Sequence, residues 1–198
     1  MTLVVGITGG IGSGKSTLTK HLLKKGYFVH DSDKEVAELY NKPRAEFVRY
    51  LKKIGLESSI KKNKINKKTI TEIIFSQKKI KNKLEKYIHK DIKKKRENFI
   101  KKHKKIKTKI IFLDVPLLLE KGLEKKFNKT ICIISPMETR YKRIKKNKKF
   151  SKTLFNQILK KQTNNKMRRK KSDFIILNNS SKNRYIKNIN KTIKELAR

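Results

Sequence analysis

The chain has 198 residues, of which 56 are Lys or Arg and only 16 are Asp or Glu, so its formal net charge is +40. This length is enough for one α/β domain with a hydrophobic core and insertions, and its one cysteine excludes an intrachain disulfide. No apolar run approaches the ~20 residues of a transmembrane helix, and no signal-peptide pattern is visible, so we expect a cytoplasmic protein without a membrane partner.

The large positive charge by itself suggests a nucleic-acid partner. Lysine is nevertheless spread along nearly the whole chain, and Asn and Ile are abundant as well. These residues have A/T-rich codons, so a biased genome can produce the charge without selection for a polyanion. Basic and aromatic residues also do not interleave as they do in single-strand binding proteins. We therefore expect no specific nucleic-acid partner, only weak non-specific binding at low salt.

Near the N-terminus, residues 9–17 read Gly-Gly-Ile-Gly-Ser-Gly-Lys-Ser-Thr and match the P-loop pattern G-x-x-x-x-G-K-[ST]. The glycines allow the backbone to curl so that successive N–H groups point at a phosphate. Lys15 adds a mobile positive charge for the β- and γ-phosphates, and the Ser16 hydroxyl can ligate Mg²⁺. The residues predicted to bind the nucleotide here are Gly12, Ser13, Gly14, Lys15, Ser16 and Thr17.

The surroundings of this loop favour a real phosphate site over a chance glycine-rich turn. The apolar run at residues 3–7 predicts a buried parallel strand before the loop. Leu18, Leu22 and Leu23 predict a helix after it, and Gly26 is placed where that helix would end. Strand, loop and helix in this order predict a protein that binds a nucleoside triphosphate.

Further along the chain, apolar runs predict more buried strands, separated by helical patterns. The strands are expected at residues 27–30, 110–114, 130–134 and 174–177. Amphipathic helical stripes fill residues 35–99, a very basic helical stretch covers Met137 to Lys171, and Ile186, Ile189, Ile193 and Leu196 predict a last helix. Cys132 lies in one of the strand runs and is expected to be a small buried residue. This alternation indicates an α/β fold with a parallel sheet and helices on both faces.

Three acids follow predicted strands, and ligands of such sheets bind at the carboxyl ends of the strands. Asp114 ends the third strand, where an acid can hold Mg²⁺ directly or through water; the alternative is an acid that only caps a turn. Asp31 and Asp33 follow the second strand, and one of them can accept the proton of an attacking hydroxyl. The alternatives are that Asp33 caps a helix beginning at Lys34 and that Asp31 is purely structural.

In the basic stretch, Arg140, Arg143, Arg168 and Arg169 stand out against a background of lysine. The planar guanidinium group is well suited to phosphate recognition, so we expect these arginines to be better phosphate ligands than the lysines.

Taken together, these segments resemble dephospho-coenzyme A kinases over most of the chain. Residues 6–17 are close to the start of that family, and residues 31–33 (Asp-Ser-Asp) are similar to its D-x-D segment, whose second acid is regarded as the catalytic base. Residues 113–120 resemble its D-V-P-L-L-x-E signature, which is more specific than the P-loop. The remaining similar residues are Lys64–Lys67, Ile74, Phe75, Leu84, Ile88, His89, Gln162, Arg168, Asp173, Asn178 and Asn179.

The chain departs from the family pattern at a few positions. Lys90 replaces a usual proline, Asn147 replaces a usual lid arginine, and Arg44 replaces a usual glycine. Ser172 and Ser180 replace small residues. None of these changes lies in the P-loop, at Asp33 or at Asp114.

The resemblance implies a P-loop NTPase fold with three α/β/α layers, a five-stranded parallel sheet, a helical substrate-binding insertion and a lid. Residues 1–33 and 108–198 would form the nucleotide-binding core, with the lid within about 117–150. Residues 34–107 would form the insertion that binds the CoA moiety.

The resemblance also implies the reaction, in which ATP and dephospho-CoA give ADP and coenzyme A. Asp33 would be the base for the ribose 3′-hydroxyl, and Lys15 would act with it in catalysis. Mg²⁺ would be held by Ser16 and Asp114. Arg140 and Arg143 would close over the phosphates from the lid, and Asn178 would lie beside the adenine.

Two other functions fit part of the sequence. A nucleotide kinase or shikimate kinase shares the P-loop and fold but lacks the signature at residues 113–120. A P-loop protein acting on nucleic acid would have hydrolysis stimulated by RNA or DNA. We expect the chain to be a monomer or a weak homo-oligomer.

Overall fold

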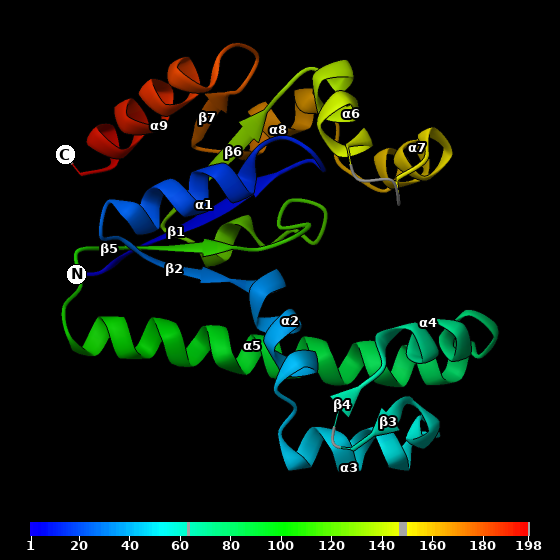
Figure 1. Ribbon diagram of the computed structural model, residues 1–198. Coiled ribbons are helices and arrows are strands. Elements are labelled where there is room, and N and C mark those ends of the chain that lie inside the picture. Colours follow the sequence, from blue (N-terminus) through cyan, green and yellow to red (C-terminus); the bar gives the residue numbers. More distant parts are fainter. Residues whose placement is uncertain (63, 147–149, 198) are drawn as a thin grey trace. The chain divides into compact units, whose positions relative to one another are not determined.

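The computed structural model describes residues 1–62, 64–146 and 150–197, and divides the chain into two units (Figure 1). The first unit is Met1–Asp31 with Ile100–Arg198, and the second is Ser32–Phe99. Asn147, where the family has a lid arginine, lies outside the described residues. Among the described residues no helix is long and apolar enough to span a membrane.

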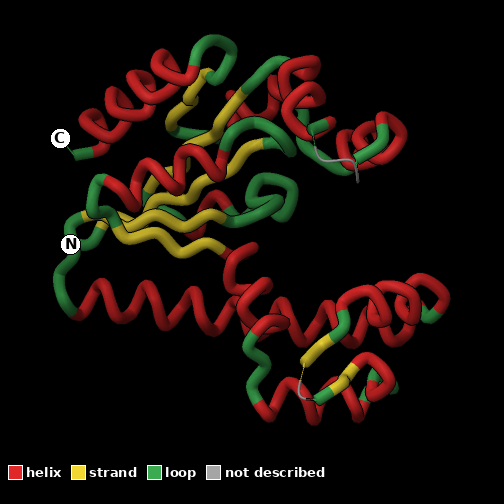
Figure 2. Tube along the Cα trace, in the orientation of Figure 1, coloured by secondary structure: helices red, strands yellow, loops and turns green. Residues whose placement is uncertain are grey.

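The first unit is built on a five-stranded sheet, as the sequence predicts. Its strands are β1 (Leu3–Gly9), β2 (Phe28–Asp31), β5 (Ile110–Asp114), β6 (Lys129–Ile134) and β7 (Phe174–Leu177). They are all parallel and follow the order β2-β5-β1-β6-β7, which puts β1 in the middle. The P-loop therefore leaves the sheet at its central strand, with the carboxyl ends of β5 and β6 on either side. Figure 2 colours the strands yellow and the helices red.

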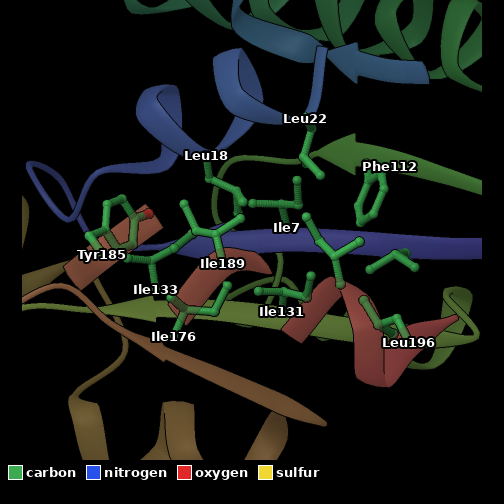
Figure 3. Close-up of a cluster of buried hydrophobic side chains, with 12 residues drawn as sticks. Ile7, Leu18, Leu22, Phe112, Ile131, Ile133, Ile176, Tyr185, Ile189 and Leu196 are labelled. Atoms are coloured by element: carbon green, nitrogen blue, oxygen red, sulfur yellow. The ribbon is translucent and has the colours of Figure 1, made fainter. Parts of the chain in front are cut away.

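Helices α1 (Lys15–Lys24) and α9 (Lys182–Leu196) bury their apolar stripes against one face of this sheet. Leu18 and Leu22 of α1 and Ile189 of α9 meet Ile7 and Ile133 of the strands in a fully buried cluster (Figure 3). At about 25 cal/mol per Å² of apolar surface, such side chains each contribute about 2 kcal/mol when buried. This packing fixes the start of α1, and with it the end of the P-loop.

The opposite face of the sheet carries α8 (Asn165–Lys171), which contacts β6. Side chains alternate along a strand, so Cys132 points away from the face that Ile131 and Ile133 cover. It is fully buried, as predicted, and burial raises the pKa of its thiol to about 11. Cys132 is therefore a protonated packing residue at neutral pH.

Within the described part of the basic stretch that the sequence predicts to be helical there are three helices: α6 (Met137–Lys145), α7 (Lys152–Lys160) and α8. The divisions come from capping residues. Ser151 accepts a hydrogen bond from the Leu154 N–H, and Asn164 accepts one from the Met167 N–H. Side chains that satisfy the first N–H groups of a helix favour a helix start at that point. The lid was predicted within about residues 117–150, and strand β6 occupies part of this range. A lid within it can therefore be formed only by residues outside β6.

The second unit is mainly helical. It contains α2 (Ser32–Asn41), α3 (Ala45–Lys53), the 3-10 turn η1 (Glu57–Ser59), α4 (Lys67–Ser76) and α5 (Lys78–Lys105) up to Phe99. Its own core is formed by Leu39, Phe47, Leu51, Ile54, Leu56, Ile70 and Leu84. A short antiparallel pair, β3 (Ile60–Lys61) and β4 (Lys64–Ile65), was not predicted. In the first unit, a second 3-10 turn, η2 (Glu124–Lys126), lies before β6.

Candidate functional site

The P-loop, the start of α1 and two residues of α6 line an open cavity of about 250 Å³. Its lining consists of Gly10, Gly12, Ser13, Gly14, Lys15, Ser16, Thr17, Arg143 and Ile144. Gly12 and Gly14 have φ of +70° and +109°, a left-handed conformation that residues with a Cβ rarely adopt. The first N–H groups of α1 have no acceptor inside the helix, and the positive end of the helix dipole lies at the cavity. The cavity is therefore suited to an anion.

The carbonyl groups of this loop are all held by hydrogen bonds from other parts of the first unit or from the loop itself. From Gly9 to Gly14 the donors are Lys15 Nζ (3.1 Å), Ser13 N (3.1 Å), Arg140 Nε (2.7 Å), Arg143 Nη1 (3.3 Å), Asn178 Nδ2 (2.8 Å) and Tyr185 Oη (3.0 Å). In a trans peptide the C=O and the next N–H point in opposite directions. The N–H groups of Gly12, Gly14 and Lys15 therefore point away from the donors that hold the preceding carbonyl groups. This is the direction that a phosphate cradle requires.

Of the four arginines predicted as phosphate ligands, Arg168 and Arg169 lie on α8, and the two assigned to the lid, Arg140 and Arg143, lie on α6 in different surroundings. Arg143 lines the cavity, and its guanidinium also donates to Ser135 Oγ (3.1 Å) and to Asn178 Oδ1 (3.0 Å). Arg140 is buried behind the loop, with 5% of its surface exposed. Burial, and to a lesser extent the positive charge of Arg168, lowers the pKa of Arg140 to about 10, so it stays charged at neutral pH.

Asn178 follows β7 and is buried, with protein partners at both ends of its side chain. Its Nδ2 donates to the Ser13 carbonyl, and its Oδ1 accepts from Arg143. Its own carbonyl accepts a hydrogen bond from Ser135 Oγ at 2.7 Å. The structure thus gives Asn178 a bracing position under the P-loop; a contact with adenine stays a prediction.

The predicted acids lie at or just beyond strand ends. Asp114 ends β5 and is 6% exposed, and Asp31 ends β2 at the partner position in the parallel register. Since β5 also pairs with β1, these two carboxylates lie at the carboxyl ends of the strands, the same end of the sheet from which the P-loop emerges. Asp33 lies in the second unit, in the first turn of α2. The helix begins at Ser32, so the alternative that Asp33 caps a helix starting at Lys34 is wrong.

Three residues that hold the loop have no counterpart among the predicted site residues, and one of them is Gln162, which accepts a hydrogen bond from the Ile11 N–H at 3.2 Å. Tyr185 donates to the Gly14 carbonyl from α9, and burial raises the pKa of its hydroxyl well above the ordinary value. Ser135 follows β6 and contacts both Arg143 and Asn178. Tyr185 lies one turn before Ile189 and so extends the predicted apolar stripe of that helix, but helical spacing does not reveal its hydroxyl contact.

Replacement of Gly14 tests whether nucleotide binding depends on the backbone conformation of this loop. In Gly14→Ala the new Cβ would collide with Asn178 Nδ2 and would force alanine to adopt a left-handed φ. We expect affinity for a fluorescent ATP analogue to fall at least tenfold. The control is Gly26→Ala, where φ is +79° but no atom lies within 4 Å of the new Cβ. It should lose about 1–2 kcal/mol of stability yet bind the analogue normally. Equal loss of binding in both variants would contradict the prediction.

Comparison with known proteins identifies the family. The family model described as dephospho-CoA kinase matches residues 3–184. The chain belongs to the dephospho-CoA kinase family. A dephospho-CoA kinase from Fusobacterium nucleatum is 37% identical over 180 residues, which cover 90% of this chain and 91% of that protein. The solved structure of the dephospho-CoA kinase from Campylobacter jejuni covers 100% of this chain and 98% of its own, with 29% identity and a TM-score of 0.75.

A solved shikimate kinase from Acinetobacter baumannii is similar in fold alone. It covers 99% of this chain and 93% of its own with 14% identity and a TM-score of 0.52. The predicted P-loop kinase fold is confirmed by the five-stranded parallel sheet and by these neighbours. As a member of the dephospho-CoA kinase family, the chain is a phosphotransferase.

Proposed function

We propose that this family member transfers the γ-phosphoryl group of ATP to the ribose 3′-hydroxyl of dephospho-CoA, giving coenzyme A and ADP, the last step of coenzyme A biosynthesis. The observation that carries this proposal is the dephospho-CoA kinase match over residues 3–184, which includes the P-loop cavity and the helical unit. We also propose that the protein works in the cytoplasm as a monomer or weak homo-oligomer.

On the donor side, the loop N–H groups and Lys15 hold the β- and γ-phosphates. The Lys15 ammonium already lies at the loop, where it donates to the Gly9 carbonyl at 3.1 Å. Arg143 lines the same cavity and supplies a second positive charge. Fixed positive groups aimed at the transferred phosphoryl group stabilise the charge that develops in the transition state. Arg140 and Arg143 lie on α6, within the range that we propose closes over the nucleotide and excludes water.

The residues proposed to hold Mg²⁺ have suitable chemistry. Ser16 lines the cavity with a hydroxyl, and Asp114 offers a carboxylate at the end of β5. Magnesium prefers oxygen ligands and commonly takes only one or two from the protein, the rest coming from water and phosphate. Within residues 1–62, 64–146 and 150–197 no cluster of three or more His, Cys, Asp or Glu could hold a metal. The ion, when bound with ATP, neutralises charge on the phosphate oxygens.

On the acceptor side, we propose that Asp33 orients the 3′-hydroxyl and accepts its proton. Support comes from the resemblance of residues 31–33 to the D-x-D segment of the family and from their position directly after a strand that borders β5. We propose that residues 34–107 bind the rest of dephospho-CoA. The helical unit has a separate hydrophobic core, so its surface can be shaped for this ligand without disturbing the nucleotide site.

The test is an ADP-release assay with ATP and Mg²⁺ at moderate salt, with and without dephospho-CoA. We expect release to require dephospho-CoA and coenzyme A to accumulate in equal amount. ADP release that does not depend on dephospho-CoA but increases with added RNA would overturn the proposal in favour of a nucleic-acid function. Release that requires shikimate or a nucleoside monophosphate would overturn it in favour of another small-molecule kinase.

A further inference from the structure

The Ile11 peptide groups in the first half of the P-loop are held by two side chains from distant helical segments. Gln162 Oε1 accepts a hydrogen bond from the Ile11 N–H at 3.2 Å, and Arg140 Nε donates to the Ile11 carbonyl at 2.7 Å. The two side chains also contact each other, because Arg140 Nη2 donates to Gln162 Oε1 at 3.1 Å. Gln162 follows α7, and Arg140 lies on α6. A single oxygen atom therefore links the loop to a buried cation.

This contact fixes the part of the loop that has the most conformational freedom. Glycines occupy positions 9, 10, 12 and 14, so Ile11 is the only residue among the first four of the loop with a side chain. Glycine loses more conformational entropy than any other residue when it is ordered. Once the N–H and the C=O of Ile11 are both held, the backbone torsion angles of its neighbours Gly10 and Gly12 are restricted as well. A loop ordered before the nucleotide arrives binds phosphate more tightly than one that must order on binding.

The space around the contact is filled on both sides. A Cβ added at Gly10 would collide with Arg140 Nη2 and would lie 3.0 Å from Gln162 Oε1. The Arg140 guanidinium lies over the Phe155 ring of α7, 5.9 Å from its centroid. Because Arg140 is almost fully buried, loss of its oxygen partner would leave a charged group poorly satisfied.

The turn that carries Gln162 is itself held by the acid at the end of the 113–120 signature. Glu120 Oε1 accepts a hydrogen bond from the Thr163 N–H at 2.8 Å and pairs with Arg168 Nη2 at 3.6 Å. The Arg168 side chain is 4% exposed and the Glu120 side chain 15%. The same segment contains Asp114, so a continuous series of contacts joins the loop after β5 to the P-loop.

From this geometry we propose that Gln162 is a positioning residue for ATP, acting through the Ile11 peptide groups and supported by Arg140 and Glu120. The proposal rests on the proposed kinase function for its activity measurements, and it assigns Gln162 no contact with either substrate. Because Oε1 accepts both hydrogen bonds, the contact needs an acceptor at this atom and not an amide. A carboxylate can fill that role, whereas a thioether of similar length cannot.

The experiment compares Gln162→Met with Gln162→Glu, and uses Gln157→Met as the control on the exposed side of α7. We expect Gln162→Met to raise both the Kd for a fluorescent ATP analogue and the KM for ATP at least tenfold. The KM for dephospho-CoA should change less than twofold. Gln162→Glu should stay within threefold of the unmodified protein in each quantity, and Gln157→Met should be unchanged. A general loss of structure would not separate the two substrates or be rescued by Glu.

Three results would overturn the proposal: an ATP-analogue Kd within twofold of normal in folded Gln162→Met, equal impairment of the Glu and Met variants, or equal increases in both KM values. If Gln162→Met does not fold, Gln162→Asn provides the same test, since its shorter side chain keeps the amide but does not reach Ile11. If the unmodified protein does not phosphorylate dephospho-CoA, the proposed function fails, while the ATP-analogue titration still tests the contact.

Discussion

An Asp33→Asn variant is expected to lose about 10²- to 10⁴-fold in kcat while its affinity for ATP stays within twofold, because removal of a general base affects proton transfer and not donor binding. The amide has almost the same shape as the carboxylate, but it cannot accept the 3′-hydroxyl proton at neutral pH. Steady-state kinetics with dephospho-CoA and titration with a fluorescent ATP analogue measure the two effects separately.

The matched control for this variant is Glu35→Gln, which removes another acid from the first turn of α2. Acids there are favourable near the positive end of the helix dipole, so each variant should lose only about 0.3–1 kcal/mol of stability for that reason. Glu35 also pairs with Lys95 at 2.7 Å within the helical unit. We expect its kcat to remain near normal. Near-normal turnover in Asp33→Asn, or an equal loss in both variants, would contradict the role of Asp33 as base.

The second large effect is expected for Lys15→Ala, which should lower kcat/KM for ATP by about 10²- to 10³-fold, the usual result of removing one preorganised hydrogen-bond donor that stabilises a transition state. ATP affinity should fall as well, because Lys15 interacts with phosphates in the ground state too. The apo protein should lose little stability, since the one hydrogen bond that the Lys15 ammonium donates in the described structure goes to the Gly9 carbonyl. Kinetics, ATP-analogue titration and thermal melting test these three statements.

Lys20→Ala serves as the control for Lys15→Ala, because Lys20 lies on the same helix α1 with an exposed side chain. It removes one positive charge from a chain of net charge +40 without touching the cavity. We expect normal kinetics in this variant. If Lys20→Ala and Lys15→Ala reduced ATP affinity equally, general attraction of the polyanion by the protein surface would explain the effect, and the specific role of Lys15 would be wrong.

The sheet could be predicted from the sequence because each of its strands contains a short, largely apolar run. Burial on both faces of a parallel sheet demands such runs, and little else in this lysine-rich chain resembles them. The division of the basic stretch was not predicted, because lysine and arginine favour helix almost as well as alanine and give no sign of a break. The caps at Ser151 and Asn164 are visible in the sequence, but similar polar residues are common throughout the chain.

The phosphate cradle could be predicted for a different reason, since the P-loop pattern is local and its chemistry depends on nine neighbouring residues. The side chains that hold the loop from outside could not be found in this way. Arg140, Gln162, Asn178 and Tyr185 reach it across 129 to 171 positions of the chain. The guanidinium group of Arg140 predicted a phosphate contact, which stays a prediction; its hydrogen bonds to Ile11 and Gln162 depend on the folded arrangement and give no local sequence signal.

The external bracing of the P-loop carbonyls has a consequence for protein synthesis. The glycine-rich loop is synthesised long before the donor that holds the Gly14 carbonyl, Tyr185, which is 171 positions later in the chain. The strand β1 also cannot form its hydrogen bonds within the sheet until its neighbours β5 and β6 have been synthesised. Contacts this distant in sequence form slowly. A nascent chain is therefore expected to acquire affinity for nucleotide only when α9 has been made and has folded onto the sheet.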